Sequence, residues 1–204
     1  MEEWRELART VPGTLLRVAE GTIELLGTLD SAHRALAALI RVALSLLRGD
    51  ADAVAVNRDE VREQPDARAM LDDARRALVR LRELHDMASQ VFHLCATRPT
   101  RLAPEAADAL WKTWARHRGE TYRHGCRALE SLRSAASHSR TSRDALLMVR
   151  SLPRQSPEWT AWVSASLNLL RRAVWAATKA RLAARRMRDA VAVELEDALK
   201  VINR

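Results

Sequence analysis

The sequence is poor in the residues that form turns, disulfides and membrane spans. Its 204 residues include only six Gly, six Pro, one Tyr, one Phe and two Cys, although six Trp are present. Scarce Gly and Pro are typical of a helical protein with few turns. Cys95 and Cys126 are too few for a disulfide framework, so we expect reduced thiols in a cytoplasmic protein. No run of 18 apolar residues occurs, which predicts that the chain does not span a membrane.

The chain also lacks the short motifs that support common enzymatic chemistries. It has no Gly-x-x-x-x-Gly-Lys-Ser/Thr loop, no Gly-x-Gly-x-x-Gly turn and no Gly-x-Ser-x-Gly elbow. None of the six His lies three or four residues from another, and no Glu-x-x-His pair occurs. Metal ligation from one helix face needs such spacings. We therefore expect a protein that is not an enzyme, with no catalytic residues, no metal and no cofactor.

Apolar residues recur at three- and four-residue spacing along most of the chain, which predicts an all-α fold. Four long helices are expected, at residues 14–47, 66–96, 104–138 and 156–202. Short helices are expected near 2–9 and 141–152, and residues 49–65 form an acidic, irregular and mobile loop. Such lengths predict an antiparallel bundle of four long helices with one or two short extra helices, folded as a single domain over residues 1–204.

Capping residues mark several of the expected helix ends. Thr14, Asp66 and Ser156 each precede an apolar-periodic segment, where N-cap residues are found. Thr141 begins a capping-box spacing and is expected to open a short helix. Gly49 follows the first long helix, as glycine does at many helix C-termini.

The last expected helix has the longest apolar stripe. Twelve of its residues step along one face at a mean spacing between that of a straight helix and that of a heptad seam. The stripe consists of Val163, Leu167, Leu170, Val174, Ala177, Ala180, Ala184, Met187, Val191, Leu195, Ala198 and Ile202.

Basic residues are distributed unevenly along the chain. Residues 1–100 carry 14 basic and 16 acidic side chains, a net charge of −2, whereas residues 101–204 carry 20 and 10, a net charge of +10. Arg outnumbers Lys by 31 to 3, a ratio that a GC-rich genome also produces. Base composition does not place charge in one half of a chain, however. An acidic N-terminal half and a basic C-terminal half therefore predict a polyanionic or acidic partner.

Aromatic residues accompany the basic residues of the C-terminal half. Arginine contacts phosphate well and aromatic rings stack on unpaired bases, a mixture typical of single-stranded nucleic-acid binding. Alternatively, most tryptophans belong to the core and the arginines only cover a solvated face. Trp175 is the exception, because it lies off the apolar stripe between basic residues. The candidate nucleic-acid-binding residues are Arg116, Arg118, Arg123, Arg127, Arg171, Arg172, Trp175, Lys179, Arg181, Arg185, Arg186 and Arg188.

Together these features predict a protein that binds RNA or single-stranded DNA through its backbone, largely independently of sequence. Such a protein would be an accessory or small subunit of a larger ribonucleoprotein complex, with other protein subunits as partners. One alternative is an assembly module that packs its long last helix against an acidic protein. Another is a helical ribonuclease of the HEPN type, which carries Arg followed closely by His. Arg80/His85, Arg118/His124 and Arg133/His138 match that spacing, about as often as chance predicts in so Arg-rich a chain.

Overall fold

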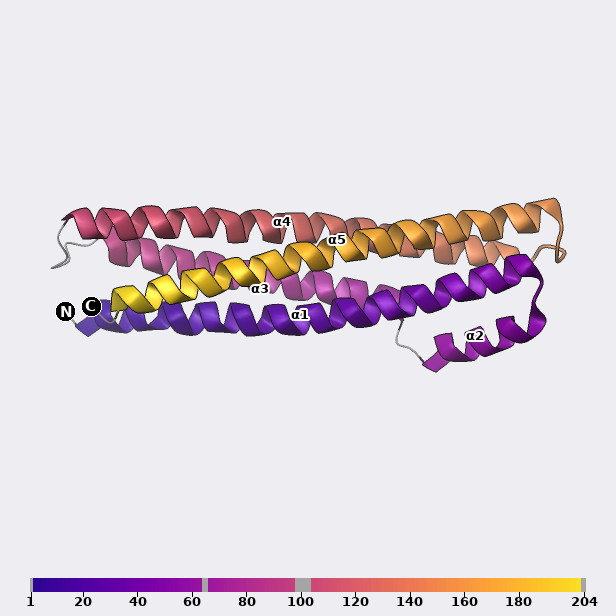
Figure 1. Ribbon diagram of the computed structural model, residues 1–204, viewed down its shortest axis with the longest axis horizontal. Helices are drawn as coiled ribbons and strands as arrows, with labels where there is room; N and C mark the ends of the chain where they lie inside the picture. The colour runs from indigo at the N-terminus through magenta and orange to yellow at the C-terminus, as the bar shows by residue number, and fades with distance from the viewer. Residues whose placement is uncertain (1, 64–65, 98–103, 203–204) are drawn as a thin grey trace. The chain divides into compact units, whose positions relative to one another are not determined.

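A computed structural model describes residues 2–63, 66–97 and 104–202, and all its regular secondary structure is helical. Five helices follow one another in this part of the chain (Figure 1). They are α1 (Glu2–Arg48), α2 (Ala51–Glu63), α3 (Ala67–Thr97), α4 (Pro104–Val149) and α5 (Pro157–Ile202). The all-α prediction is confirmed, and no strand occurs within the described ranges.

The chain contains two compact units, and the expectation of a single domain stays a prediction. Unit 1 comprises Met1–Leu26, Arg76–Ala128 and Leu182–Arg204, and unit 2 comprises Gly27–Arg75 and Leu129–Arg181. Each unit therefore takes segments from both the acidic and the basic half of the sequence. Unit 1 contains 18 basic and 14 acidic side chains and unit 2 contains 16 and 12, so each has a net charge of +4. The charge asymmetry along the sequence is not an asymmetry between the units.

Three of the expected capping signals act as predicted. The backbone N–H of Trp159 donates to Ser156 Oγ at 3.1 Å, and that of Arg68 donates to Asp66 Oδ1 at 2.9 Å. Gly49 has a φ of 71°, a conformation that glycine adopts readily beyond a helix C-terminus. These local interactions mark the starts of α3 and α5 and the end of α1.

Two expected helix boundaries are wrong. The sequence predicts a break at Pro12 before a cap at Thr14, but α1 continues through both residues. Val11 and Leu15 are buried on either side of Pro12, so packing of this face favours a continuous helix. Thr141 likewise lies inside α4. The hydroxyls of Thr14 and Thr141 donate to the carbonyls of Thr10 and Ser137, four residues earlier, instead of capping a helix.

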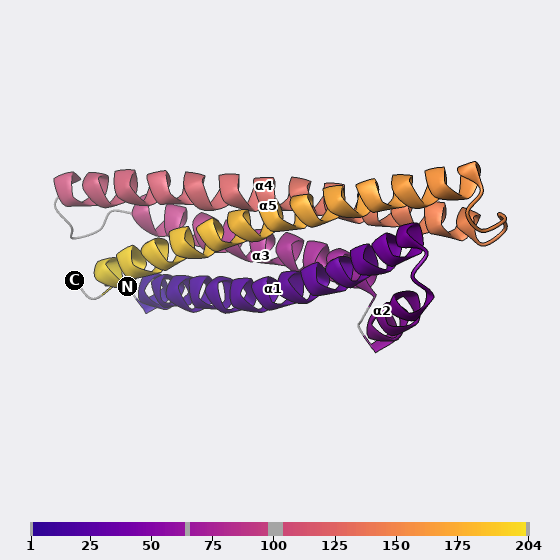
Figure 2. The same cartoon turned by 45° about the vertical axis from the view of Figure 1, so that its right-hand side comes forward.

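The expected irregular loop at residues 49–65 is wrong for most of its length, because residues 51–63 form α2. The N–H of Ala53 donates to Asp50 Oδ1 at 2.9 Å, which caps this helix. α2 lies beside the last turns of α1 in both views of the ribbon (Figures 1 and 2). Asn57 Nδ2 donates to Ser45 Oγ at 2.9 Å, and Arg41 forms an ion pair with Glu60. Polar contacts therefore hold a helix that contains no buried residue.

Unit 1 is packed around residues from four helical segments. Buried side chains come from α1, α3, α4 and α5, and Trp114 is the largest of them. Gly21 allows a close approach here, since a Cβ at that position would lie 2.5 Å from Leu81 Cδ2. The core of this unit includes Leu15, Val18, Leu25, Leu78, Leu81, Trp114, Met187 and Val191.

Unit 2 has a core in which alanine is frequent. Small side chains let helix backbones approach closely, and larger residues fill the spaces between the layers. At the turn between α4 and α5, Trp159 packs with Val149 and Val163. Of the twelve stripe positions predicted for the last helix, nine are buried across the two units, Val174 and Leu195 are partly buried, and Ile202 lies outside the described side chains.

Candidate nucleic-acid interface

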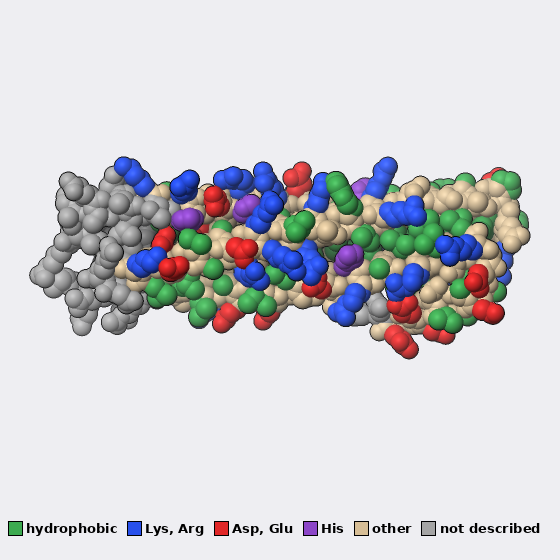
Figure 3. Space-filling view, viewed as in Figure 1, with side chains coloured by type: hydrophobic (Ala, Val, Ile, Leu, Met, Phe, Trp, Pro, Cys, Tyr) green, Lys and Arg blue, Asp and Glu red, His purple; other side chains and the backbone are tan. Residues whose placement is uncertain are grey.

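The residues predicted to bind nucleic acid lie on α4 and α5. On the face drawn in Figure 3, Lys and Arg side chains gather along these two helices, while Asp and Glu are more frequent along α1 and α2. Ten of the twelve predicted residues are exposed, and Arg181 and Arg188 are partly buried. Unit 1 contains Arg116, Arg118, Arg123, Arg127, Arg185, Arg186 and Arg188, and unit 2 contains Arg171, Arg172, Trp175, Lys179 and Arg181.

In unit 1, arginines from two helices converge on His124. Partial burial lowers the pKa of His124 below 6.5, and the positive charges of Arg186 on α5 and of Arg127 and Arg123 on α4 lower it further. Glu120 opposes this effect. The His124 Nδ1 atom is buried and has no hydrogen-bond partner within the described residues. The protonated imidazole is disfavoured here because the local potential is positive.

The arginines around His124 are available to a ligand. Among the described residues, Arg123, Arg127 and Arg186 are exposed and form no hydrogen bond or ion pair with another side chain. Their guanidinium groups thus remain free to donate to an anion from outside. We call these three residues the arginine cluster.

Other predicted residues are engaged within the protein. Arg181 Nη2 donates to Asp30 Oδ2 at 3.0 Å in unit 2, and Arg188 Nη2 donates to Asp189 Oδ1 at 2.9 Å in unit 1. The Arg118 guanidinium carbon lies 5.6 Å from the centroid of the buried Trp114 ring. These contacts make Arg181 and Arg188 weaker candidates for phosphate binding than the arginine cluster.

In unit 2, Trp175 and Lys179 form an exposed pair. Trp175 is 63% exposed, as its position off the apolar stripe predicts. Lys179 Nζ lies 3.3 Å from the centroid of the indole ring, a cation–π contact that covers one ring face. By contrast Trp114 and Trp159 are buried, as core tryptophans are, and the side chains of Trp111 and Cys95 lie outside those that the structure describes.

Sequence reasoning missed a buried polar network in unit 1. Nε2 of His85 on α3 lies 2.7 Å from Oε2 of Glu194 on α5, and the Thr121 hydroxyl on α4 donates to Glu194 Oε1 at 2.5 Å. His85 and Glu194 are 2% and 1% exposed. Helical spacing could have indicated that both residues are buried. His85 follows the apolar Leu81 by four residues, and Glu194 follows the apolar Val191 by three.

This burial bears on the ribonuclease alternative. His85 belongs to one of the three Arg–His matches, and its ring is enclosed and lies against Glu194. Within the described residues there is also no group of three His, Cys, Asp or Glu side chains arranged to hold a metal ion. No helix in the described part of the chain is long and apolar enough to cross a membrane.

Comparison of the chain with known proteins finds no matching family model, no matching curated protein and no matching solved structure.

Proposed function

We propose that the protein binds the backbone of RNA or single-stranded DNA, and that the arginine cluster of unit 1 contacts the phosphates. The observation that carries this proposal is that Arg123 and Arg127 on α4 and Arg186 on α5 lie near His124 with exposed side chains that form no ion pair among the described residues. Cations from two helices thus act on one point of the surface, opposed there by Glu120. Phosphate contacts of this kind are independent of sequence and weaken with salt.

Trp175 and Lys179 of unit 2 supply the second element of the proposal. An exposed indole can stack on an unpaired base, and the neighbouring ammonium can contact the phosphate beside it. Lys179 covers one ring face, so a base stacks on the other face or displaces the lysine. The exposed indole favours a single strand, whose bases are unpaired, whereas the phosphate contacts are possible with a single strand or a duplex.

The remaining expectations form part of the same proposal. The four long helices pack as an antiparallel bundle, and the protein acts without catalysis as a cytoplasmic subunit of a larger nucleoprotein complex. Other protein subunits are its partners there.

An assembly module is the second candidate, and exposed apolar residues on α5 favour it: Trp162, Leu182, Val193 and Leu199. Each of these would add an apolar contact beside the basic residues of α5 when an acidic protein binds.

A binding experiment with matched variants tests the proposal. Fluorescence anisotropy of labelled oligouridylate and oligothymidylate, each about 20 nucleotides long, is measured with wild-type protein in 50 mM salt. Combined Arg123→Gln, Arg127→Gln and Arg186→Gln substitutions should reduce affinity by about tenfold or more, because three phosphate contacts are lost. The control removes the same charge from exposed positions on α1 and α2: Arg17→Gln, Arg48→Gln and Arg58→Gln.

The control should lose less than about threefold, since only the long-range field changes. Equal losses in both variants, or no binding by wild-type protein, would overturn the arginine cluster as the interface. Affinity should also fall steeply between 50 and 200 mM salt. Capture of an acidic protein by the exposed face of α5, without nucleic acid, would favour the second candidate.

A further inference from the structure

Unit 2 contains a cavity of about 430 Å³ that is separate from the proposed nucleic-acid contacts. This volume falls within the usual range of small-molecule sites. All five helices or their flanking residues contribute to the lining, and none of the lining residues belongs to the arginine cluster. The lining consists of Ala35, Leu39, Val61, Asp66, Ala67, Arg68, Ser139, Ser142, Arg143, Leu146, Arg150 and Leu170.

The cavity combines apolar walls with a basic lining. Ala35, Ala67 and Leu170 are buried, and Leu39, Leu146 and Val61 complete the apolar part. Arg68, Arg143 and Arg150 supply three positive charges against the single carboxylate of Asp66. Small-molecule sites typically have this composition, in which apolar surface binds the body of a ligand and a few polar groups orient it.

The acid and one of the arginines in the lining already have partners. Asp66 Oδ1 accepts the backbone N–H of Arg68, and the Arg68 side chain lies 3.9 Å from Asp72 Oδ2. Among the described residues, the side chains of Arg143 and Arg150 form no hydrogen bond or ion pair. The cavity therefore has two guanidinium groups available to an anion.

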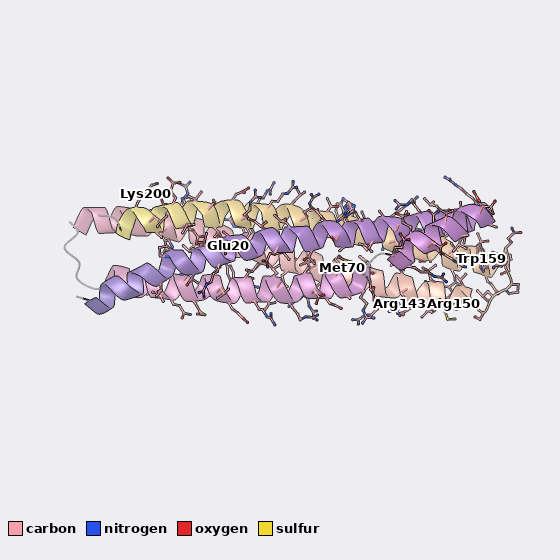
Figure 4. All side chains as sticks on the ribbon, turned by 90° about the horizontal axis from the view of Figure 1, so that it is seen from below. Glu20, Met70, Arg143, Arg150, Trp159 and Lys200 are labelled. Atoms are coloured by element: carbon pink, nitrogen blue, oxygen red, sulfur yellow. The ribbon has the colours of Figure 1, made fainter. Side chains whose placement is uncertain are left out.

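Helix geometry explains why Arg143 and Arg150 share the cavity. Arg143 lies in the last turns of α4 and Arg150 directly follows its last residue, Val149, so the two positions are seven residues apart and lie on the same side of the chain (Figure 4). Leu146 lies between them on that side. An anion next to one guanidinium would therefore have apolar surface beside it. The Ser142 hydroxyl lies 2.7 Å from the Ser166 hydroxyl and is already hydrogen-bonded.

The geometry points to a binding site for a small organic anion with an apolar body. Its carboxylate or phosphate is held by Arg143 and Arg150, and its body contacts Leu39 and Leu146. Arginine recognises both kinds of oxyanion through paired N–H donors. The apolar body distinguishes this ligand from a nucleic-acid phosphate, which would not fill the apolar part of the cavity. The site gives the protein a small-molecule ligand in addition to its proposed polymeric one.

Anilinonaphthalene sulfonate is a suitable probe, since it joins a sulfonate to an aromatic body. Fluorescence titration of the full chain should show one saturable site. Combined Arg143→Gln and Arg150→Gln substitutions should weaken binding by about tenfold or more, because both charged donors are lost. The matched control is Arg133→Gln with Arg140→Gln, exposed residues of α4 with the same spacing but outside the cavity.

Further ligands test the chemistry of the site. The uncharged analogue N-phenyl-1-naphthylamine should bind wild-type protein more weakly than the sulfonate and should be insensitive to the Arg143 and Arg150 substitutions. Octanoate or octyl phosphate should displace the probe, and the better competitor identifies the preferred oxyanion. Displacement by neither, or equal losses in the cavity and control variants, would overturn the proposal.

The test separates this site from the nucleic-acid interface. Displacement of the probe by a single-stranded oligonucleotide would assign Arg143 and Arg150 to the polymer-binding surface and overturn the small-molecule site. Loss of oligonucleotide binding in the arginine-cluster variant should leave the probe titration unchanged, because the two sets of residues share no member. Failure of one proposal is thus distinguishable from failure of the other.

Discussion

Nε2 of His85 lies 2.7 Å from Oε2 of Glu194 in the core of unit 1, although 109 residues separate the two positions in the sequence. Thr121 bonds the second carboxylate oxygen of Glu194, so three helices are joined through one buried acid. A buried polar group is tolerated only when its partners are in place. The network therefore specifies how α3, α4 and α5 align within this unit.

Replacing Glu194 by Leu should destabilise the protein by about 3 kcal/mol or more. The substitution leaves the buried His85 ring without its partner, whereas the Thr121 hydroxyl can turn to a carbonyl of its own helix. Equilibrium unfolding in urea, followed by circular dichroism, measures the loss.

The double variant with His85→Leu and Glu194→Leu provides the control for this prediction. It should lose much less than the sum of the two single variants, because neither partner is left unpaired. The Thr121 hydroxyl can then bond a carbonyl of its own helix. Additive losses would show that the two side chains are not coupled.

The pKa of His124 reports whether α4 and α5 bring their arginines together. Arg186→Gln should raise this pKa towards 6.5, because one of the charges that lowers it is removed. Arg185→Gln is the matched control, since Arg185 is its exposed neighbour and is not among the charges that shift His124. NMR titration of the imidazole resonances gives both values. An identical pKa in the two variants would contradict the convergence.

The lowered pKa of His124 also has a consequence for stability. As pH falls below 6.5, the unfolded chain takes up a proton before the folded protein does, so the free energy of unfolding decreases. Above 6.5 the residue has no such effect, and below the folded-state pKa the decrease is complete. His124→Gln should remove this pH-dependent decrease in the free energy of unfolding. Urea unfolding of both proteins at about pH 8 and about pH 5 measures the difference.

Two glycines of α1 should respond oppositely to alanine. Gly27 has open space where a Cβ would lie, so Gly27→Ala should raise the free energy of unfolding by about 0.5–1 kcal/mol through helix propensity. At Gly21 the added Cβ would lie 2.5 Å from Cδ2 of the buried Leu81. Gly21→Ala should therefore show no gain, or a loss, because Leu81 must move. Urea unfolding compares the variants, and equal gains would show that Leu81 moves freely.

Local chemistry explains what could be predicted about individual residues. Trp175 was predicted to be exposed because its helical position falls outside the apolar stripe, and Ser156 and Asp66 were predicted to cap helices because their side chains reach nearby N–H groups. Pro12 and Thr141 were misjudged because burial of neighbouring apolar residues outweighs a local preference for a break. Local signals are reliable only where packing does not oppose them.

The candidate site required information that no local pattern contains. Arg181 and Arg186 are both basic residues of α5 that the sequence does not distinguish. In the structure Arg181 pairs with Asp30, whereas Arg186 lies near His124 together with Arg123 and Arg127. The Arg–His spacing at His85 gave no indication that this ring is buried against Glu194. These differences depend on residues far apart in the sequence, which only the packing of helices brings together.

The sequence by itself determined the helical class, most helix ends and the apolar stripe of α5, because periodicity and capping act over a few residues. Tertiary structure decided how charge is distributed in space. It combined the acidic and basic halves into two units that each have a net charge of +4. It also decided which arginines are free and placed Arg143 and Arg150 beside a cavity. Charge along a chain becomes a potential only when folding sets the distances between charges.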